Sequence, residues 1–123
     1  GDNNGRIWPL PILTPRSDPH KKPELVAPAE SVAVINKEGT WSLSDGTSAA
    51  TVYVTGAIAL LLQNNPELAA NGTQDNIANI NQVKEWIEQT SLPRPTQEGH
   101  DDEYGYGLLQ IKALIDAANP EDS

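Results

Sequence analysis

The sequence predicts a mixed α/β fold, in which short strands come first and helices follow. Three observations carry this prediction. Residues 31–43 are two strand-like segments around a turn, residues 47–64 are apolar over a helical length, and two later segments have apolar residues at helical spacing. The chain has 123 residues, which fits one domain of ordinary size, roughly 100–150 residues.

The proline-rich segment at residues 9–23 forbids a long helix and predicts an extended loop. Trp8, Leu10, Ile12 and Leu13 are the apolar side chains by which this loop could pack against the rest of the protein. Residues 24–27 are short and apolar, and Pro28 follows them, so they predict a short strand.

A β-hairpin is predicted next. Residues 31–35 are rich in β-branched side chains, and residues 40–43 form the returning strand. Residues 36–39 have the composition of a hairpin turn, in which Gly39 can adopt a positive φ. Residues 44–46 predict a second turn.

Residues 47–64 predict a central helix that is buried on all sides, because a helix that is apolar all round is not a surface helix. Asn65 and Pro66 stop it. Small residues cluster in its first half and allow other backbone to approach closely: Ala49, Ala50, Gly56, Ala57 and Ala59.

Two further helices are predicted. A polar loop over residues 69–80 leads to a helix that is capped by Asn79 or Asn81. An acidic, proline-containing loop over residues 91–103 leads to the last helix, which ends at Asn119-Pro120. The apolar faces of these helices are Val83, Trp86 and Ile87 in the first, and Leu108, Ile111, Leu114 and Ile115 in the second.

Composition excludes several classes of function. Acidic residues outnumber basic ones by 17 to 8, and the net charge of −9 argues against a nucleic-acid partner. The absence of Cys excludes a disulfide scaffold and a cysteine nucleophile. The longest apolar run, residues 57–62, is far too short to span a membrane, and the polar N-terminus is unlike a signal peptide. Because the chain contains no Met, we expect a processed or excised piece of a longer product.

Ser48 is the candidate nucleophile. It lies where a Gly-Thr turn meets the predicted helix, so its backbone N–H belongs to the unpaired donors of the first helical turn. An oxyanion formed on attack by the Ser48 Oγ could therefore be held by the Ser48 N–H itself, and the helix dipole favours negative charge there. The alternative is that Thr47 or Ser48 only caps the helix.

The segment around Ser48 resembles the nucleophile signature of the subtilisin-like serine proteases, or subtilases, G-T-S-M-A-T-P-H-V-A-G. Residues 22–29 resemble the K-P-D-V-V-A-P-G strand that precedes this signature, and residues 104–110 resemble the G-x-G-x-x-N segment that opens the family's last helix. Residues 2–7 also resemble a family loop. The signature matches at Gly46, Thr47, Ser48, Ala50, Thr51, Val54 and Gly56.

The resemblance implies a three-layer fold with a mainly parallel sheet. Residues 1–123 would be only its C-terminal portion: a β-hairpin, the central buried helix and the C-terminal helices. In such proteases the chain order is Asp, His, Ser, so both partners of Ser48 and one oxyanion donor are expected upstream of this chain. Gly46, Thr47 and Gly56 would support the motif.

The resemblance also implies partners and a setting. The substrate would be a protein or peptide, and the first partner would be the rest of the chain's own peptidase domain. The family is often secreted and often binds Ca²⁺, but no motif here assigns a calcium or other metal site, and no cofactor is expected. The segment alone is expected to be inactive. The alternative function is a non-catalytic subtilase-like module for binding or scaffolding.

Several other residues have plain interpretations. His20 and His100 are expected in surface loops, and the acidic residues after His100 are expected to face solvent. Residues 71–73 match the N-x-T pattern of an N-glycosylation site, but this pattern is short and common by chance, so we assign no glycosylation from it. The tryptophans are expected to serve packing, although Trp41 could instead lie at the rim of the nucleophile site. A free chain is expected to leave a large apolar surface exposed, to pair with another copy or to rearrange.

Overall fold

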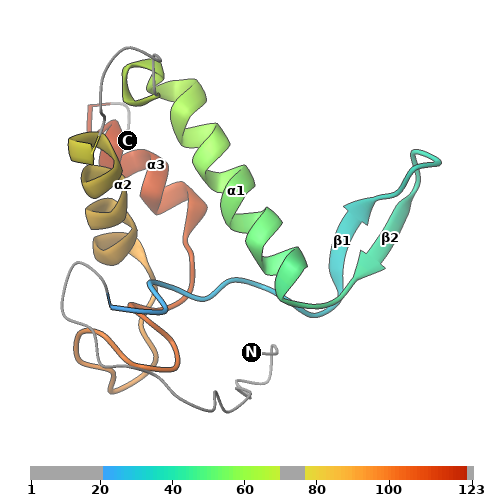
Figure 1. Ribbon diagram of the computed structural model, residues 1–123, viewed down its shortest axis with the longest axis horizontal. Helices are drawn as coiled ribbons and strands as arrows, with labels where there is room; N and C mark the ends of the chain where they lie inside the picture. Colours follow the sequence, from blue (N-terminus) through green and yellow to red (C-terminus); the bar gives the residue numbers. More distant parts are fainter. Residues whose placement is uncertain (1–20, 70–76, 122–123) are drawn as a thin grey trace.

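The computed structural model describes residues 21–69 and 77–121. In Figure 1 one long helix, α1, runs diagonally through the molecule, with a β-hairpin beyond its first turn and two shorter helices beside its other half. None of the described helices is long and apolar enough to cross a membrane. The elements are β1 (Val32–Ile35), β2 (Trp41–Ser44), α1 (Thr47–Asn64), the 3₁₀ turn η1 (Pro66–Leu68), α2 (Ile77–Thr90) and α3 (Ile111–Ala118).

The hairpin confirms the predicted strands and turn. β1 and β2 are antiparallel, and their register runs from Val32 opposite Ser44 to Ile35 opposite Trp41. The Asn36 side chain accepts the Thr40 N–H at 3.0 Å, and Gly39 has a φ of 77°. These features close a tight turn, because a positive φ costs glycine little.

The hydrophobic core lies between the second half of α1, α2 and α3. Leu61 from α1 and Leu114 from α3 are both 0% exposed. Val83 and Trp86 of α2 pack against this core, as their helical spacing predicts. The buried members of the core are Ala57, Leu61, Ile87, Leu109 and Leu114.

Three segments that are distant in sequence meet below this core. Val26 forms a parallel bridge with Leu108, and Leu92 forms an antiparallel bridge with the same residue. Gly105 and Gly107 have positive φ values of 60° and 122°. A Cβ atom on either glycine would collide with the neighbouring backbone, at 2.7 Å from the Leu25 nitrogen for Gly105. The glycines therefore permit the close approach of these segments.

Two predicted boundaries in the β-rich and final segments are wrong. Residues 24–27 form no regular strand; Val26 alone makes a bridge. Leu108 does not lie on the last helix, because α3 begins at Ile111. Its backbone exchanges two hydrogen bonds with Leu92, and its neighbours Gly107 and Leu109 bond to Val26. Leu109 is buried in the core instead.

The start of α2 is also earlier than predicted. The helix begins at Ile77, so Asn79 and Asn81 both lie inside it and neither is its cap. The Asn79 amide donates instead to the carbonyls of Glu67 and Leu68, both at 3.4 Å. Tertiary contact with η1 outweighs the cap preference of asparagine.

The prediction that α1 is buried on all sides is wrong for the described chain. Only Ala57 and Leu61 of this helix are buried, whereas Val52 and Leu60 are 69% and 47% exposed. The reason is that α2 and α3 cover one side of the second half only, and the described residues supply nothing for the other side. Residues 47–64 are nevertheless helical over the predicted range.

Candidate active site

The turn before α1 is held by two backbone anchors. Gly46 has a φ of 115°, and its N–H donates to the carbonyl of Ala29 at 2.7 Å. The Asp45 carboxylate accepts the N–H of Ser31 at 2.6 Å. No atom lies within 4 Å of a Cβ built at Gly46, so its conformation and not its space requires glycine. The end of the 22–29 segment therefore positions the turn that precedes Ser48.

Ser48 occupies the first turn of α1 and is exposed to solvent. Within the described ranges no carbonyl accepts its N–H, whereas Ala49 and Ala50 both donate to the carbonyl of Gly46. The hydroxyls of Thr51 and Thr55 bond back to carbonyls one turn earlier, at 2.9 Å each. Ser48 thus combines an accessible hydroxyl with an N–H that has no acceptor among residues 21–69 and 77–121, and attack on a carbonyl and stabilisation of the resulting anion require these two groups.

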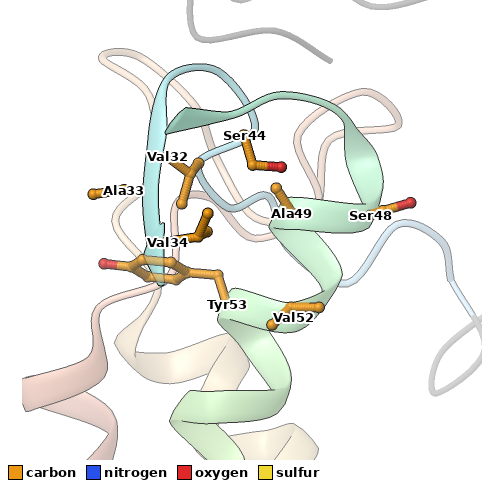
Figure 2. Close-up of a pocket in the computed structure, with 8 residues that line it drawn as sticks. All are labelled: Val32, Ala33, Val34, Ser44, Ser48, Ala49, Val52 and Tyr53. Carbon is orange, nitrogen blue, oxygen red and sulfur yellow. The ribbon is translucent and has the colours of Figure 1, made fainter. Parts of the chain in front are cut away.

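A hollow of about 290 Å³ lies beside this helix turn, between the hairpin and α1. Figure 2 shows Val32 and Val34 projecting from β1 towards Ala49 and Tyr53 of the helix, while the Ser48 hydroxyl points away from the strands. The hollow is lined mainly by apolar side chains, so it offers Ser48 no acid or base.

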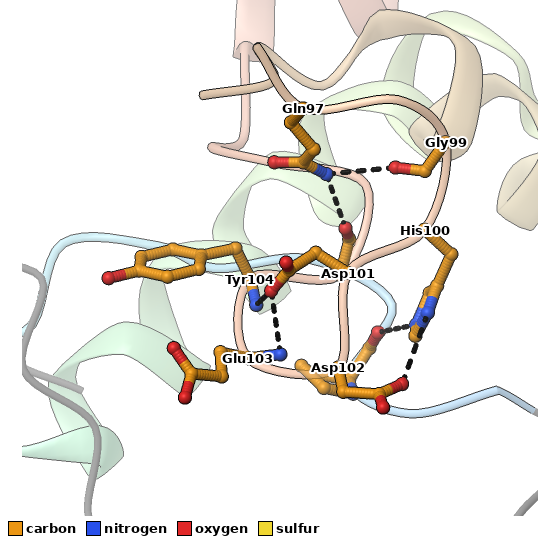
Figure 3. A network of polar contacts seen from close by, with 9 residues as sticks. Gln97, Gly99, His100, Asp101, Asp102, Glu103 and Tyr104 are labelled. Carbon is orange, nitrogen blue, oxygen red and sulfur yellow. Dashed lines mark hydrogen bonds and ion pairs between the residues drawn. The ribbon is translucent and has the colours of Figure 1, made fainter. Parts of the chain in front are cut away.

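His100 is not the surface residue that the sequence predicts. Its side chain is 4% exposed, its Nε2 lies 2.9 Å from the carbonyl oxygen of Pro23, and its Nδ1 lies 3.8 Å from the Asp102 carboxylate. The ring also meets the edge of Tyr106, with centroids 5.3 Å apart. Figure 3 shows the two polar contacts of the His100 ring, one to Asp102 and one to a backbone carbonyl oxygen, together with the turn closed by Asp101. His100 thus joins the 91–107 loop to the N-terminal segment and does not contact Ser48.

Asp101 organises the tip of the same loop. Its Oδ1 accepts the N–H groups of Glu103 and Tyr104 at 2.8 and 3.0 Å, and its backbone exchanges two hydrogen bonds with Gly105. Among the described residues no group of three or more His, Cys, Asp or Glu side chains could hold a metal ion. The acidic residues here therefore serve the loop structure or face solvent.

Glu24 lies between two lysines that lower the pKa of its carboxyl. Partial burial alone would raise the pKa of its carboxyl, but the ammonium groups of Lys22 and Lys84 hydrogen-bond to it, and the pKa is lowered overall. The Lys84 Nζ lies 3.3 Å from the Glu24 Oε1. This pair connects the N-terminal segment to α2 and has no contact with Ser48.

The sequence profile of the subtilase family matches this chain over residues 7–107. The chain belongs to the subtilase family. A search of characterised protein sequences returned no significant match. Because the match includes the turn at Gly46, the helix and the 104–107 segment, it covers the elements that position Ser48 and those that anchor them.

Two solved structures with a similar fold are those of proteases. The structure of the CspB protease of Clostridium perfringens has a TM-score of 0.62 and 24% sequence identity, and the match covers 80% of this chain and 20% of that one. The patellamide maturation protease PatA has a TM-score of 0.55 and 22% identity, covering 78% of this chain and 34% of that one. The subtilase described here thus spans about a fifth and a third of these two neighbours, and its mixed helix–strand structure is part of a subtilisin-like α/β fold.

The structure separates the predicted site residues. Gly46, Thr47 and Ser48 lie together at the junction of β2 and α1, while Gly56 lies two turns further along the helix. Nothing lies within 4 Å of a Cβ built at Gly56, so its supporting role stays a prediction. His20 and residues 71–73 lie outside the described residues. Sequence reasoning missed the bond from Gly46 to Ala29, because no local pattern announces a contact between backbone groups seventeen residues apart.

Proposed function

We propose that this subtilase segment supplies the nucleophile of a serine endopeptidase. The Ser48 Oγ would attack the carbonyl of the scissile peptide bond, and the Ser48 N–H would donate a hydrogen bond to the oxyanion that forms. The observation that carries the proposal is the exposed Ser48 in the first turn of α1, with no acceptor for its N–H in the described part of the chain. Its position in the signature at residues 46–56 supports the same role.

The general base and its orienting acid would come from the rest of the peptidase domain. His100 is the one histidine among residues 21–69 and 77–121, and it is bonded to Pro23. Asp45 is close in sequence, but its carboxylate holds the N–H of Ser31. A histidine from another segment would accept the Ser48 proton on attack and return it to the leaving amine. The segment by itself should therefore show no peptidase activity.

This chemistry needs no cofactor, and we assign no calcium ligand in this chain. The substrate would be a protein or peptide, and the setting would be extracellular, as is common in the family. The alternative is a non-catalytic subtilase-like module used for binding or scaffolding. Because no general base lies beside Ser48 in the described residues, the experiment below is designed to distinguish this alternative from a peptidase.

Labelling with a fluorophosphonate probe tests the proposal on the longest natural protein that contains this chain. The probe should label the protein, and Ser48→Ala should abolish labelling while leaving the unfolding midpoint unchanged, because the side chain is exposed. Ser42→Ala in β2 is the matched control and should label like the wild type. A folded full-length protein that stays inert to the probe would favour the non-catalytic alternative.

A further inference from the structure

Asp45 directly precedes the turn into α1, but its carboxylate does not cap that helix. An aspartate at the start of a helix commonly accepts a backbone N–H of the first turn. α1 follows Gly46 and has no side-chain cap, whereas the Asp45 carboxylate accepts the N–H of Ser31 at 2.6 Å, across the open end of the hairpin. Hydrogen bonds to an ionised acceptor are typically short and strong. The carboxylate is therefore used to join the two arms of the hairpin and not to stabilise the helix.

Ser31, which donates to this carboxylate, has an unusual backbone conformation. Its φ is 53°, and in the described part of the chain Thr96 is the only other residue with a side chain that has a positive φ. Residues that carry a Cβ seldom adopt this conformation, and they keep it only where their surroundings impose it. Because strained residues of this kind cluster at functional sites, the pairing of Ser31 with the residue before the Ser48 turn points to a functional role.

A second bond joins the same two arms one position further along. The Gly46 N–H donates to the carbonyl of Ala29 at 2.7 Å. We call this bond and the bond from Ser31 to Asp45 the hairpin clasp. Its N-terminal side is fixed, because Ala29 is 6% exposed and the backbone of Val26 bonds to residues 107–109. The hairpin clasp therefore ties the start of α1 to a segment that belongs to the packed part of the protein.

Packing does little to fix the angle between the hairpin and α1. A hollow of about 290 Å³ lies between β1 and the start of the helix (Figure 2). No atom lies within 4 Å of a Cβ built at Gly46, so no contact there restrains the turn. Trp41 of β2 is 73% exposed, and the expectation that it serves packing is wrong within the described chain. Among the described residues, this junction is therefore restrained mainly by the hydrogen bonds of the hairpin clasp.

Gly46 transmits this restraint to Ser48. The Gly46 carbonyl accepts the N–H groups of Ala49 and Ala50 at 3.1 and 3.4 Å. A change in the orientation of Gly46 would therefore tilt the first turn of α1, together with the Ser48 hydroxyl and N–H. Attack requires the reacting atoms to be about 3–3.5 Å apart, and a misplacement of about 1 Å can cost roughly 10²-fold in rate.

We infer that Asp45 is a positioning residue for Ser48. Its carboxylate keeps the hairpin clasp closed and thereby sets the direction from which the Ser48 Oγ attacks, without itself touching the substrate. This inference rests on the proposed function, because it needs Ser48 to be the nucleophile. An amide oxygen can accept the same N–H, so asparagine should replace Asp45, whereas a side chain with no acceptor should not.

Two variants of Asp45 test the inference in the longest natural protein that contains this chain. Asp45→Ala should slow fluorophosphonate labelling about tenfold and lower kcat for a cleaved peptide to the same extent with KM unchanged, because misplacement of Ser48 affects attack and not binding. Its unfolding midpoint should stay close to that of the wild type, since the hairpin clasp lies outside the hydrophobic core. Asp45→Asn should restore labelling and kcat.

Glu38→Ala is the matched control. Glu38 is another exposed carboxylate of the hairpin, and it pairs only loosely with Lys37, at 3.6 Å. Its removal changes the net charge by the same amount as Asp45→Ala and leaves the hairpin clasp intact. This variant should label and cleave like the wild type.

The outcomes separate this inference from the proposed function. A labelled wild type whose Asp45→Ala variant reacts equally fast overturns the inference and leaves the serine peptidase intact. Equal losses in Asp45→Ala and Asp45→Asn also overturn it, because the charge and not the bond to Ser31 would then matter. An Asp45→Ala variant that loses rate together with a large fall in its unfolding midpoint overturns it as well, since Asp45 would then serve the fold. A wild type that is not labelled at all removes both the inference and the proposed function.

Discussion

The two halves of α1 lie in very different surroundings. In the second half Ala57 and Leu61 are enclosed by α2 and α3, and the core is continuous there. The hairpin lies beyond the start of the first half (Figure 1), only Val54 of residues 47–55 packs against the core, and Val52 and Tyr53 remain exposed. The composition of the helix is apolar throughout, so its neighbours and not its sequence decide which part is buried.

This difference assigns separate tasks to the two halves. The packed half, with the loop that Gly105 and Gly107 allow to close, carries the stability of the described chain. The open half holds Ser48 and lies beside the hairpin, and few buried contacts resist change there. Substitutions in the two halves should therefore differ in cost even between neighbouring residues of the same type.

The largest effect is expected at Gly107. Its φ is 122°, and a Cβ there would lie 2.8 Å from the Cα of Pro93 and closer still to the Leu92 carbonyl. Gly107→Ala should destabilise the protein by more than about 4 kcal/mol, because rigid backbone would have to move. The control Gly39→Ala has open space and a φ of 77°, and should cost only about 1 kcal/mol in urea unfolding. Equal costs would contradict the close packing of the loop.

The next largest effect compares two adjacent leucines of α1. Leu61 is 0% exposed and Leu60 is 47% exposed. Leu61→Ala should lower the free energy of unfolding by about 3 kcal/mol through the cavity that it leaves. Leu60→Ala should change it by about 0.5 kcal/mol or less in this chain.

The free energies of unfolding of the Leu60→Ala and Leu61→Ala variants should also be measured in a longer protein that contains this chain, because they then report whether the open side of α1 is covered there. If the rest of the peptidase domain covers the open side of α1, Leu60→Ala should become costly there as well. A Leu60→Ala variant that stays neutral in the longer protein would show that this side of the helix remains exposed. Urea unfolding followed by circular dichroism gives both values.

The smallest effect is a dependence of stability on pH at Glu24. Because the pKa of this carboxyl is lowered on folding, its ionised form stabilises the folded state. The contribution is complete above the unfolded value of about 4.5 and is lost as the pH falls through the lower folded value. Wild type and Glu24→Gln should therefore differ by roughly 0.5 kcal/mol at pH 7, because water screens a partly exposed ion pair, and should converge in acid. A difference that persists at low pH would contradict the pairing with Lys22 and Lys84.

Local signals predicted much of this fold. The turn at residues 36–39, the strands around it and the full extent of α1 follow from short-range composition and apolar spacing. The start of α2 and the place of Leu108 were not predictable in this way. The Asn79 amide donates to carbonyls of η1, and the backbone of residues 107–109 bonds to Val26 and Leu92. Such long-range contacts cannot be read from the local sequence pattern.

In the candidate site, too, some features follow from local sequence and others depend on long-range contacts. The sequence by itself determined the helix, the glycine turn and the place of Ser48 in its first turn, because these depend on residues within a few positions of one another. Only the tertiary structure decided that His100 is buried against Pro23, and that Gly46 is held by Ala29. It also decided that half of an apolar helix is open, because burial depends on which surfaces meet and not on the composition of one segment.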